Sequence, residues 1–206
     1  MRKSLVFAAA LVVAGGWVGS AVAQAPVYTP ENAHLYGSGP AVYRNAPGMG
    51  SRSNASPIPR QTVRFEGNHA PGTIIVRTAE RRLYYTLGNG KAIKYAVGVG
   101  RQGFTWAGSN RISRKAEWPG WTPPAQMRAR ERAKGRILPA FQKGGPDNPL
   151  GARAMYIGST LYRIHGTNQP STIGQAMSSG CIRMANDDVI HLFNQVKVGA
   201  RVIVQH

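Results

Sequence analysis

The chain contains a single cysteine, Cys181, and a histidine, His165, lies sixteen residues before it. A thiolate is a strong nucleophile, and an adjacent imidazole can remove the thiol proton and then stabilise the thiolate as an imidazolium. The cysteine stands in the run Ser-Ser-Gly-Cys-Ile-Arg at 178–183, which is typical of a polar loop, whereas a structural cysteine packs among apolar side chains. The pair therefore predicts nucleophilic catalysis, with Cys181 as the nucleophile and His165 as its general base.

Glycines beside both residues indicate how the backbone could assist. Gly180 permits a tight turn that exposes the sulfur atom, so we expect the backbone N–H groups of Gly180 and Cys181 to form an oxyanion hole. The second ring nitrogen of His165 needs an acceptor that fixes its tautomer. Because no Asp or Glu lies between positions 147 and 187, we expect a backbone carbonyl, that of Gly166, to accept this hydrogen bond.

No metal site and no cofactor are predicted. A zinc site takes three or four protein ligands. The other histidines, at positions 34, 69, 191 and 206, have no ligand spacing with Cys181 and His165. We therefore assign no residue as a metal ligand.

The first 23 residues have the three parts of an export signal. Arg2 and Lys3 form a charged start, residues 5–18 are mostly apolar, and Ala-Val-Ala at 21–23 is a typical cleavage site. A membrane anchor is the alternative, but the apolar run is shorter than a full span and ends in small residues. No later segment is long and apolar enough to span a bilayer. We therefore expect an exported protein with no transmembrane segment after cleavage, in which a lone thiol has no internal partner.

The charge of the chain indicates the kind of partner. Basic residues outnumber acidic ones by 26 to 8, which gives a formal net charge of +18 at pH 7. Such a charge attracts nucleic acid, anionic lipid headgroups or a carboxylate-rich cell wall. Export disfavours nucleic acid, and charge alone does not decide between lipid and wall.

The elements that must position the cysteine and the histidine are expected from Pro71 onward. Residues 24–70 are rich in Pro, Gly and Ser, so we expect a flexible arm without a core of its own. The prolines within 107–122 predict a loop or the edge of a sheet. Apolar runs between turn residues predict strands at 73–76, 82–87, 91–97, 152–157, 161–165 and 200–205, with a hairpin turn at 88–90.

Two segments have helical character. Residues 124–134 begin with a proline and carry little apolar stripe, which predicts a surface helix. Residues 186–196 have apolar side chains at helical spacing, with Asn186 as the expected N-cap. Several short strands with a small helical addition predict a mainly β fold over residues 71–206, a sandwich or a barrel.

The motifs resemble those of the L,D-transpeptidase catalytic domain, the YkuD family. The likeness covers residues 71–206, and the family usually has a second histidine where this chain has Ser179 and an Asn where it has Arg183. The run Ser-Ser-Gly-Cys-Ile-Arg resembles Gram-negative members, and it leaves His165 as the general base. The matching stretches are Asn-Pro-Leu-Gly at 148–151, His-Gly-Thr-Asn at 165–168, the cysteine run at 178–183 and Val-Gly-Ala-Arg-Val at 198–202.

The resemblance implies an L,D-transpeptidase-like β-sandwich or barrel and an activity on the periplasmic cell wall. Cys181 would attack the bond between diaminopimelate and D-Ala in a peptidoglycan tetrapeptide stem and form an acyl-enzyme. An amine would then accept the acyl group, which gives a 3→3 crosslink or tethers an envelope protein to the wall. Water as the acceptor would make the protein an L,D-carboxypeptidase.

Four further residues are candidates for substrate binding, namely Arg183, Thr167, Ser179 and Trp118. Arg183 could hold a substrate carboxylate with its planar fork or form a structural ion pair. Trp118 could line the cleft or pack in the core, and Thr167 could shape the cleft. A hydrolase of the same fold and a non-catalytic cationic module that binds the wall stay open as alternative functions.

Overall fold

The structure is a computed structural model that describes residues 54–101 and 106–206. The expected export signal at 1–23 and the arm up to residue 53 lie outside the described residues. The helices are α1 (Ala125–Arg132), α2 (Asn186–Gln195) and a short 3-10 helix at Pro170–Thr172. The strands are β1 (Gln61–Arg64), β2 (Ile74–Arg77), β3 (Arg82–Gly88), β4 (Lys91–Ala96), β5 (Val99–Gly100), β6 (Gly108–Glu117), β7 (Arg153–Ile157), β8 (Arg163–His165), β9 (Ala176–Ser178), β10 (Ile182–Arg183) and β11 (Arg201–Gln205).

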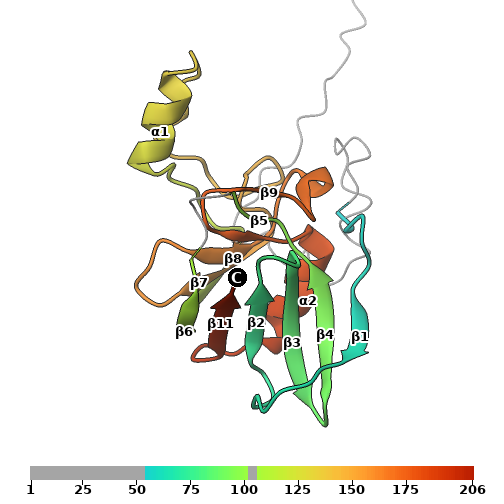
Figure 1. The fold of residues 1–206 in the computed structure, drawn as a ribbon. Coiled ribbons are helices and arrows are strands. Elements are labelled where there is room, and N and C mark those ends of the chain that lie inside the picture. Colours follow the sequence, from blue (N-terminus) through green and yellow to red (C-terminus); the bar gives the residue numbers. More distant parts are fainter. Residues whose placement is uncertain (1–53, 102–105) are drawn as a thin grey trace, which may run out of the picture.

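A single long strand joins the two halves of the sheet. Nine of the strands run in the order β1-β4-β3-β2-β11-β6-β7-β8-β10, while β5 and β9 pair separately (Figure 1). The first part of β6 pairs with β11 and the rest pairs with β7. Its ladder with β7 shifts register between Ile112 and Arg114, and such a bulge bends a strand. The fold is therefore mainly β with a small helical addition, which confirms the expected fold class.

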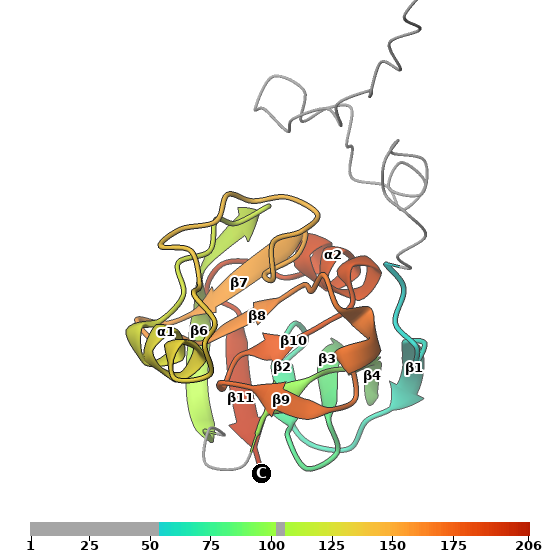
Figure 2. The same cartoon turned by 90° about the horizontal axis from the view of Figure 1, so that it is seen from above.

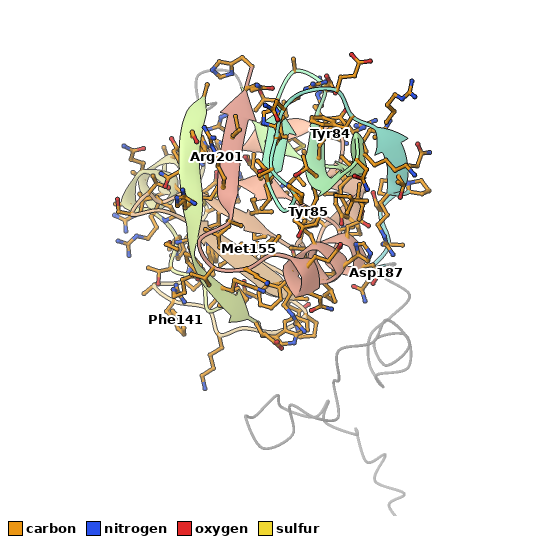
Figure 3. The ribbon with its side chains drawn as sticks, turned by 90° about the horizontal axis from the view of Figure 1, so that it is seen from below. Tyr84, Tyr85, Phe141, Met155, Asp187 and Arg201 are labelled. Atoms are coloured by element: carbon orange, nitrogen blue, oxygen red, sulfur yellow. The ribbon has the colours of Figure 1, made fainter. Side chains whose placement is uncertain are left out.

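The main core lies between the two halves of the sheet. Ile74 and Val76 enter it from β2 because alternate residues of a strand point to the same face. Met155 of β7 enters it from the other half, where Figure 3 labels it. The amphipathic helix α2 lies beside β7 (Figure 2) and adds Val189 and Leu192 to the same core. This packing holds β7, and through it β8, in place behind the candidate site.

The folded domain begins before the expected boundary between residues 70 and 71. β1 pairs antiparallel with β4, and Phe65 packs with Ile75 and Tyr84 on the outer face of the sheet. Farther back, the carbonyl oxygen of Asn54 accepts a hydrogen bond from the backbone N–H of Asp187 at 3.1 Å, near the start of α2 (Figure 3). An edge strand can be held by main-chain hydrogen bonds, so its polar composition conceals it in the sequence.

Two local expectations were wrong. Residues 108–117, expected to be a loop or a sheet edge, form the inner strand β6, because only the prolines beyond residue 117 interrupt pairing. Asn186 is the first residue of α2 rather than its N-cap, and the N-cap residue is Ala185, which makes no side-chain capping bond. The side-chain oxygen of Asn186 instead accepts a hydrogen bond from the backbone of Ala152.

The surface helix α1 forms as the sequence predicts. Pro124 stands at its N-cap, and none of its residues is buried. The helix stands away from the sheet in Figure 1, and Glu131 pairs with basic side chains around it, Arg130, Lys134 and Arg136.

Candidate active site

The cysteine and the histidine lie at the ends of two neighbouring parallel strands. His165 is the last residue of β8, and Cys181 immediately precedes β10. The register places Ile182 opposite Ile164 and Arg183 opposite His165. Neighbouring strands lie about 4.8 Å apart and alternate residues share a face, so Cys181 and His165 occupy diagonal positions on one face. Pairing of β8 with β10 thus brings together two residues that are distant in the sequence.

The imidazole of His165 is buried, with 5 % of the residue exposed. Its Nδ1 lies 2.6 Å from the carbonyl oxygen of Gly166. An Nδ1–H that donates to this oxygen leaves Nε2 as the basic nitrogen. Burial, followed by the positive charge of Arg183, lowers the pKa of His165 to about 3, while the hydrogen bond to Gly166 acts in the opposite direction. The imidazole is therefore neutral near pH 7.

The thiol of Cys181 is free and half-buried. Its Sγ lies 3.8 Å from the carbonyl oxygen of Leu161, to which it donates. Burial raises the pKa of the Cys181 thiol, whereas a hydrogen bond from the backbone of Arg163 and the charges of Arg163 and Arg183 lower it. The nucleophile and its base are therefore both neutral in the resting structure.

Ser178 organises the loop that precedes the nucleophile. Its Oγ donates to the carbonyl oxygen of Cys181 at 2.6 Å and accepts from the backbone N–H of Gly180 at 3.2 Å. Gly180 has a φ of 106°, a conformation that favours glycine. The Gly180 N–H expected in the oxyanion hole is thus already bonded within the loop. The oxyanion hole stays a prediction, and of its two expected donors we retain the N–H of Cys181.

Asn186, which sequence patterns predict only as a helix N-cap, lies between the segment after His165 and the loop at residues 151–152. Its Oδ1 accepts a hydrogen bond from the backbone N–H of Ala152 at 3.0 Å. A Cβ added at either Gly151 or Gly166 would come within 2.3 Å of this oxygen. Glycine on both sides therefore leaves room for the amide, which packs against Gly166 beside the carbonyl that faces the imidazole. Gly151 and Gly166 were the sequence signal for this contact, but no short-range pattern links either glycine to Asn186.

We expect Gly166→Ala to destabilise the fold by about 1 to 3 kcal/mol, the usual cost of overpacking, and to slow acylation of Cys181 by displacing the Gly166 carbonyl. The new methyl would meet the Oδ1 of Asn186 at 2.3 Å. In an Asn186→Ala background this overlap is gone, so the same substitution should cost less. Denaturant unfolding of the two single variants and the double variant measures the coupling. If the two effects on the free energy of unfolding simply add, the amide of Asn186 does not pack against Gly166 in the way described.

Two of the candidate substrate residues lie beside the nucleophile. Arg183 follows Cys181 by two residues, and its Nη1 donates to the Oγ1 of Thr172 at 3.3 Å. The Oγ of Ser179 accepts from the Nη2 of Arg130 at 3.5 Å, which joins α1 to the loop that carries the nucleophile. Both residues are partly exposed.

The other two candidates are built into the protein. Thr167 is 2 % exposed, and its Oγ1 accepts from the backbone N–H of Gln169 at 3.0 Å. Trp118 packs against the cluster of Ala152 and Ile190, with an unusual φ of 42°. Thr167 is thus buried within the protein and Trp118 packs beside α2, and their expected contacts with the substrate stay predictions.

Within residues 54–101 and 106–206, no three His, Cys, Asp or Glu side chains are grouped so that they could hold a metal ion. Over the same part of the chain, no helix is long and apolar enough to cross a membrane.

The fold and the site together define a mainly β domain with a cysteine and a histidine on adjacent parallel strands. The sequence model of the L,D-transpeptidase catalytic domain, YkuD, matches residues 71–204. The chain therefore belongs to the L,D-transpeptidase catalytic domain family.

Individual relatives agree with this family. An Escherichia coli K12 protein named "Probable L,D-transpeptidase YbiS" is 43% identical over 150 residues, which are 70% of this chain and 47% of the relative. "Probable L,D-transpeptidase ErfK/SrfK" of the same strain is 44% identical over 134 residues, 63% of this chain and 42% of the relative. The chain thus spans less than half the length of these relatives. The crystal structure of L,D-transpeptidase 3 from Mycobacterium tuberculosis shares the fold, with a TM-score of 0.50 and 16% identity over 65% of this chain and 60% of that chain.

Proposed function

We propose that the protein is an exported cysteine L,D-transpeptidase that acts on peptidoglycan stem peptides. The observation that carries this proposal is the parallel register of β8 and β10, which places Cys181 diagonal to His165. The carbonyl of Gly166 at the Nδ1 of His165 supports it further, because an Nδ1–H that donates to this oxygen makes Nε2 the basic nitrogen.

In the proposed first step, the thiol of Cys181 turns from the Leu161 carbonyl towards the Nε2 of His165. Nε2 takes the proton as Sγ attacks the carbonyl carbon of the diaminopimelate–D-Ala bond. Because the pKa of the imidazole is lowered and that of the thiol is raised, the proton moves as the S–C bond forms. The N–H of Cys181 would hold the oxyanion. The C–N bond then breaks, His165 returns the proton to the amine of D-Ala, and a thioester remains on Cys181.

In the proposed second step, an amine attacks the thioester. An amide bond forms, the C–S bond breaks, and the proton of the amine returns to the thiol through His165. A second diaminopimelate as the acceptor gives a 3→3 crosslink, and a lysine of an envelope protein gives a tether to the wall. Water as the acceptor gives an L,D-carboxypeptidase.

The basic composition agrees with a periplasmic position at the wall. The chain has a formal net charge of +18 at pH 7, and peptide stems carry free carboxylates. Around α1, five basic side chains stand within twelve residues, and none of the helix residues is buried. A positive surface of this kind raises the local concentration of the protein on an anionic polymer.

The test supplies purified tetrapeptide stems as donors and tripeptide stems as acceptors. We expect crosslinked dimers, one D-Ala released for each crosslink, and an acyl adduct on Cys181 that mass spectrometry detects. Release of D-Ala without dimers would identify the hydrolase instead. Sedimentation with the wall, without D-Ala release or an adduct, would identify the non-catalytic binding module.

A further inference from the structure

One row of residues crosses the strands β6, β7 and β8 and ends at the nucleophile, just before β10. The registers place Arg114 of β6 opposite Tyr156 of β7, and Tyr156 opposite Arg163 of β8. The pairing of Ile182 with Ile164, continued by one residue, places Cys181 opposite Arg163. Arg163 is thus the direct cross-strand neighbour of Cys181, whereas His165 is the diagonal one.

The face on which this row lies follows from burial. Ile164 and Ile182 are 0 % and 1 % exposed and belong to the main core. Because successive side chains alternate between faces, Arg163 and Cys181 point to the opposite face. The next row on that face holds His165 and Arg183. Two arginines and the proposed catalytic pair therefore form a compact group of four.

The guanidinium of Arg163 has no anionic partner in the described part of the chain. Its Cζ lies 5.3 Å from the ring centroid of Tyr156. Its Nε is buried without a hydrogen-bond partner, and no ion pair to Arg163 occurs among residues 54–101 and 106–206. By contrast, the Nη2 of Arg153 lies 3.1 Å from Glu117.

An unpartnered donor in a partly buried place costs free energy, because water has been removed and nothing replaces it. A carboxylate suits such a place, since a guanidinium binds it with two parallel hydrogen bonds. Arg163 is the cross-strand neighbour of Cys181, so an anion bound by Arg163 would lie close to the carbonyl that the sulfur atom attacks. A peptide carboxylate near the scissile bond is the group that fits.

We propose that Arg163, together with Arg183 on the neighbouring strand, forms a carboxylate-binding site around Cys181 that recognises a substrate carboxylate next to the attacked bond. The inference rests on the proposed function and names the substrate group that the same site would bind. Two carboxylates share this chemistry, the terminal one of the departing amino acid and the one on the side chain of the diamino acid. The charge of Arg163 also favours the thiolate of Cys181.

The test compares Arg163→Gln with Arg114→Gln as the matched control. Arg114 stacks on the same ring, with its Cζ 3.6 Å from the Tyr156 centroid, but it lies on β6, three strands from Cys181. Acylation of Cys181 is measured with three donor stems: one with both carboxylates free, one amidated at its C-terminus and one amidated at the diamino acid side chain. The intact fold of each variant is checked by thermal unfolding.

With the free stem, Arg163→Gln should lower kcat/KM about tenfold or more, the effect of losing one charge-assisted hydrogen bond. Amidation of the carboxylate that Arg163 binds should make wild type and variant equal, and the stem that shows this identifies the carboxylate. Arg114→Gln should match wild type on all three stems. An equal loss on all three stems, or no loss, would overturn the inference. Where Arg163→Gln fails to fold, Arg163→Lys keeps the charge and should lose part of the rate on the free stem alone.

A second readout separates this inference from the proposed function. Iodoacetamide alkylates Cys181 without any acyl transfer, so a bound stem that covers the thiol should slow alkylation. Protection by the free stem in wild type but not in Arg163→Gln supports the site even if no stem is turned over. Equal protection of both proteins, or of neither, contradicts the site whatever the activity.

Discussion

Substitution of Cys181 by Ala is expected to reduce acyl transfer to background, a loss of about a thousandfold or more. The chain has no second cysteine that could replace the nucleophile. In the proposed reaction every product passes through a thioester on this sulfur atom, so crosslinking, tethering and hydrolysis should all disappear together. The release of D-Ala and the mass of the protein after incubation with tetrapeptide stems measure the loss.

The fold should survive this substitution. The Sγ donates one weak hydrogen bond, at 3.8 Å to the carbonyl of Leu161, and the backbone of Arg163 is its other polar contact. The loop itself is held by Ser178 through the backbone of Gly180 and Cys181. Thermal unfolding should therefore change little. Cys181→Ser is the matched variant, because it keeps the shape and the hydrogen bond but is a far weaker nucleophile. Wild-type turnover by either folded variant would show that the proposed function is wrong.

Substitution of His165 by Gln should lower acylation by stem peptides by about 10² to 10⁴, the usual contribution of a positioned general base. Burial lowers the pKa of His165 to about 3 and raises the pKa of Cys181, so no thiolate–imidazolium pair exists at rest.

Alkylation by iodoacetamide needs only the thiolate. Its rate should therefore rise about tenfold per pH unit below the thiol pKa, and a raised pKa moves this rise towards alkaline pH. Acylation and alkylation rates measured from acidic to alkaline pH test both expectations.

The two reactions separate the roles of the histidine. His165→Gln should slow acylation strongly while it leaves the shape of the alkylation profile nearly unchanged. His191→Gln is a suitable control. His191 lies on α2, its Nδ1 is 2.7 Å from the hydroxyl of Tyr95, and it takes no part in the proposed reaction. A plateau of alkylation across neutral pH that disappears in His165→Gln would reveal a preformed ion pair and overturn this account.

Much of the fold followed from local sequence patterns. The apolar runs predicted β2, β3, β4, β7, β8 and β11, and the turn at Gly88-Asn89-Gly90 has positive φ at all three residues, as its composition implies. Helical spacing predicted α2, whose Val189 and Leu192 are buried. These elements are legible because side-chain periodicity and turn chemistry act over a few neighbouring residues.

Strands that are held by neighbouring strands rather than by their own side chains could not be predicted from local sequence patterns. β1 lies in a segment whose composition suggested a flexible arm, and the backbone of β4 holds it. The exposed and polar strand β6 is inner because β11 and β7 flank it. In both cases the main-chain hydrogen bonds that decide the structure leave little trace in the strand's own sequence.

The residue types around Cys181 determined the family, the proposed nucleophile and base, and the carbonyl of Gly166 as the expected acceptor for the imidazole. The tertiary structure alone decided that Ser178 occupies the N–H of Gly180, that Thr167 is buried, that Asn186 fills the gap between two glycines, and that Arg163 is the cross-strand neighbour of Cys181. The physical reason is range. The chemistry of a side chain belongs to its own residue, whereas its neighbours are set by strand register and close packing between segments that are far apart in the chain.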